Sequence, residues 1–221
     1  MSERIRDGSL SMGVNELDEQ ILRGIPKGST IALLADPKSM ANQFLLHLAM
    51  TGRQTHYVTI TRPVSSIEKE AELANRDQPI ENMDIYPEYR EENNMKANLE
   101  RFVNRVGNEE NFIVDNFSQV GDDLDSKEYQ TLFRNIYKHT QREDAITFLL
   151  LLAEDESDLR PHERDMLNNA DGVFQLQTRI AGGARDNLLY IYKLRGVREI
   201  HDRGIQVLFG DRITIDASRE L

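Results

Sequence analysis

Residues 24–51 read GIPKGSTIALLADPKSMANQFLLHLAMT, and this stretch decides the fold. Its first residues have the Gly and Pro content of a turn, and the apolar run Thr30–Ala35 that follows has the composition of a buried strand. After a short polar loop, apolar residues recur at helical spacing from Ser39, the expected N-terminal cap, to Thr51, and Gly52 then ends the helix. A buried strand that leads through a loop into a helix is the opening unit of an α/β fold.

Strand-like and helix-like patterns also alternate outside this stretch. A short helix capped by Asn15 is expected before the first strand. Because each connection up to the strand at Ile146–Ala153 is long enough for a helix, we expect right-handed βαβ units and a mainly parallel sheet that helices cover on both faces. The further strands are expected at Thr55–Thr61, Met83–Tyr86, Asn111–Asp115 and Ile146–Ala153, and the helices from a capping box at Ser65 and Glu68 to about Arg76, from Met95 to Arg105, and from a capping box at Asp125 and Glu128 onward.

The pattern changes after Pro161, where short strand-like runs follow one another across glycine-bearing links. Such runs predict antiparallel strands that extend one edge of the sheet. They are Val173–Thr178, Asn187–Leu194, Ile205–Phe209 and Arg212–Ile215. The chain contains no internal repeat or low-complexity linker, so we expect one domain over residues 1–221.

The chain has no cysteine, which excludes a disulfide scaffold, a zinc–thiolate site and a cysteine nucleophile. Its longest unbroken apolar run, Phe148–Ala153, is far too short to cross a membrane, and the first residues lack the apolar segment of a signal peptide. We therefore expect a cytoplasmic protein without a membrane partner.

The surface is expected to be acidic and poor in lysine, because the chain has 38 acidic and 27 basic residues and only 7 of the basic residues are Lys. An excess of carboxylates keeps a protein hydrated where concentrated salt screens charge. We expect a salt-loving archaeal host. The net charge of −11 also argues against nucleic acid as a partner, since phosphate binding requires clustered Lys and Arg.

Short motifs surround this α/β core in a fixed order. The runs MGVNELD at 12–18 and GIPKGS at 24–29 flank the entry to the first strand. With four later runs they resemble the KaiC-like branch of the RecA superfamily over Leu10 to Ile215. The resemblance implies a RecA-like P-loop core and an ATPase that forms rings or filaments. The later runs are Tyr57–Thr59, Ile113–Asp115 at the Walker B position, Ala170–Gly172 and Lys193–Gly196.

The chain departs from that family at the P-loop. A working loop, G-x-x-x-x-G-K-[S/T], closes backbone N–H groups around phosphates and adds a Lys and a magnesium-binding hydroxyl. Here both glycines, the lysine and the hydroxyl are replaced. Asp36 would oppose a phosphate at a cost of about 4 kcal/mol at ~4 Å and an effective dielectric near 20. We expect a collapsed turn with Met40 packed against the domain and no bound cofactor. The loop reads Ala35, Asp36, Pro37, Lys38, Ser39, Met40, Ala41, Asn42.

A second departure lies after the strand at 55–61. Active members of the family carry paired glutamates there, and one of them polarises the attacking water. The corresponding residues here are Thr61 and Arg62, and neither can act as a carboxylate base. We therefore expect no catalytic residue and no ATP hydrolysis, so the protein is interpreted as a pseudo-ATPase.

Three of the remaining residues each allow a functional and a purely structural interpretation. Asp115 stands at the position of a magnesium-binding aspartate, but an Asp at the end of a strand can equally cap a loop. The resemblance implies that Lys193 and Arg195 reach across a subunit interface, whereas their alternative is a solvated pair on an edge strand. The histidines and the Asp122–Asp125 run lack metal-ligand spacing, so no metal site is expected.

The leading hypothesis is therefore a non-catalytic interaction or regulatory subunit with a role in signalling. Its expected partners are further copies of itself, an active KaiC-like ATPase relative or a signalling protein. One alternative is an ATP-binding or weak ATPase that uses Lys38 and Asp115 with ATP and magnesium. A second is a DNA recombination accessory that binds single strands near Asn116–Ser126, although that stretch is acidic and has no Arg.

Overall fold

The structure is a computed structural model of the chain. It describes residues 5–14, 16–50, 52–74, 82–87, 94–181, 184–197, 204–210 and 213–216.

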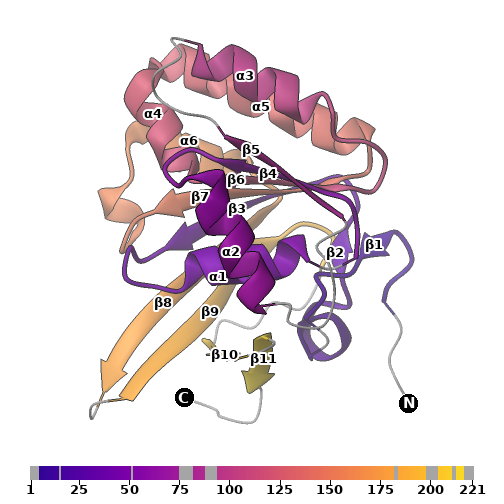
Figure 1. The fold of residues 1–221 in the computed structure, drawn as a ribbon, viewed down its shortest axis with the longest axis vertical. Helices are drawn as coiled ribbons and strands as arrows, with labels where there is room; N and C mark the ends of the chain where they lie inside the picture. Colours follow the sequence, from indigo (N-terminus) through magenta and orange to yellow (C-terminus); the bar gives the residue numbers. More distant parts are fainter. Residues whose placement is uncertain are drawn as a thin grey trace.

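A nine-stranded sheet forms the centre of the molecule, with helices on both of its faces (Figure 1). The strands in spatial order are β11 (Ile213–Asp216), β10 (Ile205–Phe209), β9 (Ala184–Leu194), β8 (Gly172–Ala181), β3 (Ser29–Ala35), β7 (Ile146–Leu152), β6 (Asn111–Asp115), β4 (Thr55–Thr59) and β5 (Met83–Pro87). The six strands from β8 to β5 pair in parallel, whereas β8, β9, β10 and β11 pair antiparallel. Both the parallel core and the antiparallel extension at the C-terminal edge are confirmed.

Strand β3 is the centre of the core, because all seven of its residues are buried between β7 and β8. Successive side chains of a strand point to opposite faces, so Ile31 and Leu33 enter one apolar cluster while Ala32 and Leu34 enter the other. Gly172 allows β8 to approach β3 closely, since a Cβ at that position would collide with the Ile31 side chain.

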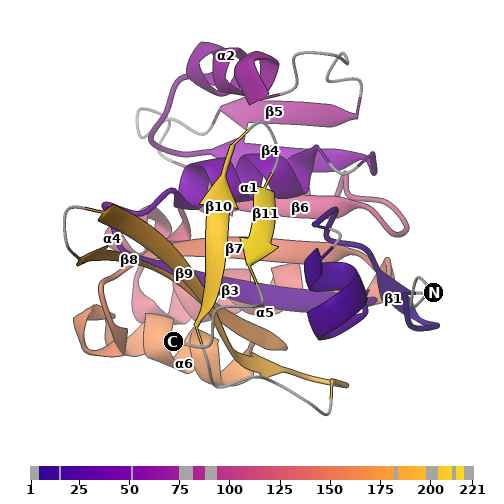
Figure 2. The same cartoon turned by 90° about the horizontal axis from the view of Figure 1, so that it is seen from below.

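Helices from different parts of the sequence cover the two faces. One face packs against α1 (Ala41–Ala49) and α2 (Val64–Ala74), and the other against α3 (Met95–Val103), α5 (Ser126–Arg142) and α6 (Pro161–Asn169). Figure 2 shows β10 and β11 crossing the α1 face. The shorter elements are β1 (Ser9–Leu10), β2 (Ile25–Pro26), α4 (Val120–Asp123), a π-helix at Leu17–Leu22 and 3₁₀ turns at Phe117–Gln119 and Glu156–Asp158. None of the helices in the described ranges is long and apolar enough to span a membrane.

Some predicted helix boundaries are wrong. Helix α1 starts at Ala41 with Met40 at its N-cap, so Ser39 does not cap it. Helix α2 starts at Val64, which places Ser65 inside the first turn instead of in a capping box. In contrast, the Asp125 cap is confirmed, because its Oδ1 accepts the Glu128 N–H at 2.8 Å. The predicted cap Asn15 and helix end Arg76 lie outside the described residues.

Strand β4 ends two residues earlier than expected. The Thr59 hydroxyl donates to the Arg62 carbonyl at 2.8 Å, and the Arg62 N–H donates to the same hydroxyl oxygen at 3.2 Å. These two bonds turn the chain after Thr59, and they hold Arg62 at the end of the strand.

Candidate functional site

The candidate site lies where parallel strands end. Four of the parallel strands run in the same direction, namely β3, β4, β6 and β7. The residues that follow their carboxyl ends therefore lie at the same end of the sheet. This edge is where open α/β sheets usually bind ligands. It brings together the loop after Ala35, the turn that contains Arg62, the carboxylate of Asp115 and the segment at Glu154.

The loop between β3 and α1 is closed by its own polar atoms. The Asp36 carboxylate accepts the Lys38 N–H at 2.7 Å, and the Asp36 carbonyl accepts the Ser39 N–H at 2.7 Å. A P-loop offers such backbone N–H groups to phosphate. In this chain, two of them already have an acceptor inside the loop.

The side chains of this loop do not converge on a common point. Lys38 is exposed, and its Nζ donates to Glu154 Oε1 at 3.2 Å. Met40 is half-buried, and its Sδ lies 3.9 Å from Asn187 Nδ2 of β9. The Ser39 hydroxyl is buried without a hydrogen-bond partner among the described residues. The cation of the loop therefore faces a carboxylate of the same chain.

Asp115 is buried at the end of β6, with 2% of its surface exposed. The Tyr57 hydroxyl of β4 donates to Asp115 Oδ2 at 2.7 Å. Burial raises the pKa of Asp115 above its usual value, although the Tyr57 hydrogen bond and the nearby Arg62 oppose that shift. Burial also raises the pKa of Tyr57, so its hydroxyl stays protonated and acts as the donor.

Arg62 brings a positive charge to the same place. Its Nη1 lies 4.0 Å from Asp115 Oδ2, and its Nη2 forms an ion pair with Glu70 of α2 and donates to Ser66 Oγ at 3.4 Å. Only 17% of the Arg62 side chain is exposed. The guanidinium therefore stands beside the aspartate where the resemblance would place a metal ion. Among the residues that the structure describes, no three His, Asp or Glu side chains are placed to hold a metal.

Lys193 and Arg195 lie near the amino ends of the parallel strands, away from the candidate site, because Leu194 pairs with Gly172 at the start of β8. The prediction that they lie on an edge strand is wrong. β9 lies between β8 and β10, and Arg195 follows the strand in a turn. The Lys193 Nζ donates to the Asn168 carbonyl at 2.9 Å, and desolvation lowers the pKa of Lys193. Both cations therefore contact their own chain.

Asp171 holds Arg195 in position. Arg195 Nη1 donates to Asp171 Oδ1 at 3.1 Å and to the Tyr137 hydroxyl at 3.3 Å, while Asp171 Oδ2 accepts the Thr30 N–H at 3.0 Å. About half of the Arg195 side chain, 53%, is nevertheless exposed. Arg195 can therefore keep its intramolecular bonds and still meet a neighbour.

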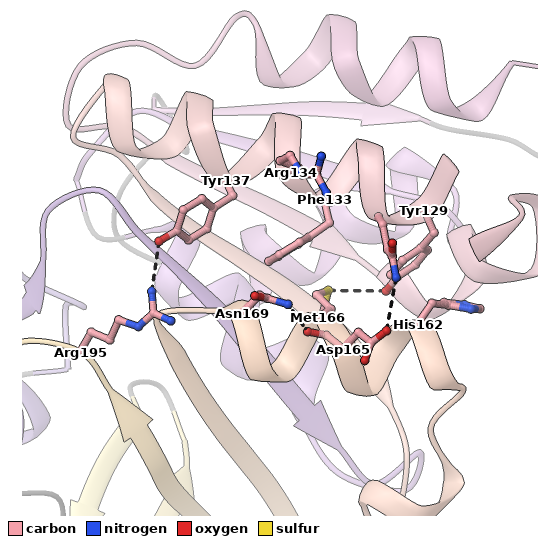
Figure 3. Close-up of a pocket in the computed structure, with 10 residues that line it drawn as sticks. Tyr129, Phe133, Arg134, Tyr137, His162, Asp165, Met166, Asn169 and Arg195 are labelled. Atoms are coloured by element: carbon pink, nitrogen blue, oxygen red, sulfur yellow. Dashed lines mark hydrogen bonds between the residues drawn. The ribbon is translucent and has the colours of Figure 1, made fainter. Parts of the chain in front are cut away.

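A pocket of about 330 Å³ lies between α5 and α6 (Figure 3). Phe133 and Met166 line its apolar part, and Arg195 stands at one end. The Gln130 amide donates to Asp165 Oδ2 at 3.3 Å and so links the two helices across it. The sequence predicted helix α5 from its capping box, but the pocket depends on where α6 packs, and no local pattern encodes that position.

A family of unknown function, DUF7125, matches residues 9–221. The chain belongs to this family. No curated protein matches it. The fold is similar to that of the crystal structure of KaiC-like protein PH0186 from the hyperthermophilic archaeon Pyrococcus horikoshii OT3, with a TM-score of 0.74, 16% identity, and coverage of 96% of this chain and 99% of that one. The expected RecA-like α/β fold is confirmed.

Proposed function

We propose that this protein is a non-catalytic, RecA-like regulatory subunit whose nucleotide site has been replaced by internal contacts. The observation that carries the proposal is Arg62, whose guanidinium lies beside Asp115 and pairs with Glu70. A magnesium ion at Asp115 would face this fixed positive charge, and like charges repel strongly at such distances. The positive charge beside Asp115 is thus the guanidinium of Arg62, a side chain of the protein itself.

The loop supports the same conclusion. Asp36 adds a negative charge where phosphates would approach, and its carboxyl and carbonyl oxygens accept two of the loop N–H groups. Binding a nucleotide would require both bonds to break and Lys38 to leave Glu154. The positions of the water-polarising glutamates are occupied by Thr61 and Arg62, so a bound nucleotide would also lack a base.

The role that remains for such a subunit is assembly. The proposed partners are further copies of the chain, an active KaiC-like relative or a signalling protein in the cytoplasm. Arg195 suits this role, because half of its side chain is exposed while Asp171 fixes its guanidinium. A cation held in this way could be offered to the site of a neighbour.

Nucleotide titration tests the proposal. A ligand present at about 100 times its Kd adds ~2.7 kcal/mol, which corresponds to a rise in melting temperature of roughly 5 to 10 °C for a domain of this size. With ATP and magnesium we expect no such rise, and no phosphate release above that of buffer. Lys38→Ala is the matched control, since it removes the one cation of the loop. A rise that disappears in Lys38→Ala would overturn the proposal.

The main alternative is an ATP-binding protein or weak ATPase, and the exposure of Lys38 is the observation in its favour. The Lys38–Glu154 pair is solvent-exposed, at 74% and 64% of the two side chains, so breaking it costs little. Lys38 could then turn toward a phosphate. The same titration distinguishes the two functions, because this alternative requires binding that depends on Lys38 and Asp115.

We further propose that the protein works in concentrated salt. The chain has a net charge of −11, so its acidic side chains repel one another. Salt weakens this repulsion, because the screening length falls from about 10 Å at 0.1 M to about 3 Å at 1 M. The melting temperature should therefore rise steadily with potassium chloride up to molar concentrations. A flat or falling melting temperature across that series would contradict a halophilic host.

A further inference from the structure

The pocket between α5 and α6 presents mainly polar groups to a ligand. Its apolar floor, formed by Phe133 and Met166, is almost fully buried, so a ligand would reach little of it. At about 330 Å³ the pocket lies at the small end of the range for ligand sites, about 300–1,000 Å³. The pocket therefore suits a small polar molecule. The lining side chains that are exposed or half-buried are Gln130, Arg134, Tyr137, Asp165, Asn169 and Arg195.

Two guanidinium groups in this lining keep free N–H donors. Arg134 is exposed and forms no ion pair with any residue in the described ranges. Arg195 is paired with Asp171, but the side-chain bonds that it forms within the described part of the chain both use Nη1. Its Nε and Nη2 groups can therefore donate elsewhere, and 53% of the side chain is exposed. Two planar sets of donors match the oxygens of a phosphate group.

Tyr137 holds Arg195 at one end of the pocket. Arg195 Nη1 donates to the Tyr137 hydroxyl at 3.3 Å, and Figure 3 shows this pair at the opposite end from His162. Arg134 precedes Tyr137 by three residues, so the two side chains lie on the same side of α5. Burial raises the pKa of Tyr137, so its hydroxyl stays protonated and adds no negative charge. This end of the pocket is positive, because Asp171 offsets only one of the two guanidinium charges.

Asp165 gives the other end of the pocket a negative charge. Its carboxylate is exposed, and Oδ2 accepts the Gln130 amide at 3.3 Å. A carboxylate has about four acceptor sites, so this bond leaves room for a donor from a ligand. The two ends of the pocket therefore require different groups. An oxyanion fits beside Tyr137 and Arg195, and a hydroxyl or ammonium group fits beside Asp165.

We infer that this pocket binds a small phosphate monoester that carries a hydrogen-bond donor at its far end. The phosphate oxygens accept from Arg134 and Arg195, and the hydroxyl or ammonium group of the ligand donates to Asp165. A phosphate monoester carries a charge of about −1.5 to −2 and three acceptor oxygens. It can therefore serve two guanidinium groups at once, whereas a carboxylate has only two oxygens to share between them.

The positive end of this pocket is distinct from the replaced nucleotide site. Arg195 lies near the amino ends of the parallel strands, because the preceding Leu194 pairs with Gly172 at the start of β8. Lys38 and Asp115 lie at the carboxyl ends of those strands. The inference goes beyond the proposed function and does not depend on it. Binding in the pocket requires Arg134 and not Lys38, so the two proposals can fail separately.

The first test is calorimetric titration of the whole chain at one fixed concentration of potassium chloride. Glycerol phosphate and phosphoethanolamine are the probes that combine a phosphate with a donor. Inorganic phosphate supplies the oxyanion alone, and glycerol supplies hydroxyl donors alone. At least one of the two monoesters should bind more tightly than inorganic phosphate, and glycerol should not bind. The inference is wrong if both monoesters have a Kd above about 10 mM, or if inorganic phosphate binds as tightly as either of them.

The second test asks whether the pocket is the binding site. Arg134→Met should raise the Kd of the monoester roughly tenfold or more, because charge-assisted hydrogen bonds to the phosphate are lost. Lys138→Met is the matched control, since it also removes one exposed cation from α5 but does not line the pocket. It should leave the Kd almost unchanged. Equal effects of the two variants would show attraction by the overall charge of α5 and would overturn the inference.

The third test places the donor of the ligand. Asp165→Ala removes the acceptor at the far end of the pocket, at an exposed position where the fold should survive, which far-UV circular dichroism checks. The variant should still bind inorganic phosphate, but it should lose the preference for the monoester over inorganic phosphate. A preference that persists in Asp165→Ala would contradict the arrangement inferred for the ligand.

Discussion

Arg62→Glu should lower the free energy of unfolding by about 3 kcal/mol, or roughly 6 to 12 °C in melting temperature. The wild-type guanidinium lies between the buried Asp115 and Glu70. The substitution removes the positive charge and places a third carboxylate beside the other two. With only 17% of the Arg62 side chain exposed, water screens this repulsion poorly.

Urea denaturation measures this loss, and Lys38→Glu is the control for charge reversal alone. Lys38 forms an ion pair with Glu154, but both side chains are exposed, so its reversal should cost less than about 1 kcal/mol. Arg62→Met, which keeps the apolar stem and removes the charge, should fall between the two. Equal losses for Arg62→Glu and Lys38→Glu would show that Arg62 contributes no more than an ordinary surface charge.

Asp115→Asn should have the opposite effect and stabilise the protein at neutral pH. Burial raises the pKa of Asp115 in the folded state above its unfolded value, so the fold disfavours the ionised form. The contribution of a group with a raised pKa is most favourable below the unfolded pKa, and it is lost as the pH rises through the folded pKa. Asparagine carries no charge, and its side-chain oxygen can still accept the hydrogen bond from the Tyr57 hydroxyl.

The measurement is urea denaturation of both proteins from acid to neutral pH. The stabilisation by Asp115→Asn should be largest at neutral pH and should shrink toward acid, where the wild-type carboxyl is itself protonated. Asp165→Asn, at an exposed carboxylate of α6, is the control for the removal of one charge alone. A neutral or destabilising effect of Asp115→Asn at neutral pH would mean that the attraction to Arg62 exceeds the cost of burial.

The sequence was most informative where a pattern repeats over many residues. The buried strands β3 and β7 were predictable from unbroken apolar runs, and α5 from its apolar positions at helical spacing. Helix starts at Ser39 and Ser65 were wrong because a cap depends on the turn that precedes it. At Ser39 the Asp36 turn delays the helix by one residue, and at Ser65 the Pro63 carbonyl already accepts the Ser66 and Ile67 N–H groups.

The candidate site was predictable only in part. The order of the motifs placed the β3–α1 loop and Asp115 at one edge of the sheet, because the ends of parallel strands meet there. The contacts of Arg62 with Asp115 and Glu70 join three separate elements, so no local spacing indicates them. The prediction that Lys193 and Arg195 lie on an edge strand failed because β10 pairs with β9 at residues 187–189.

The position of β3 has a consequence for how the chain is made. β3 is completed by residue 35, yet both of its neighbours, β7 and β8, begin beyond residue 140. During synthesis, this fully buried strand therefore leaves the ribosome long before either of its partners exists. Such late closure slows folding and exposes unpaired strand edges to other chains. The edges of β3 therefore stay without their partners until the chain has been synthesised beyond Gly172, where β8 begins.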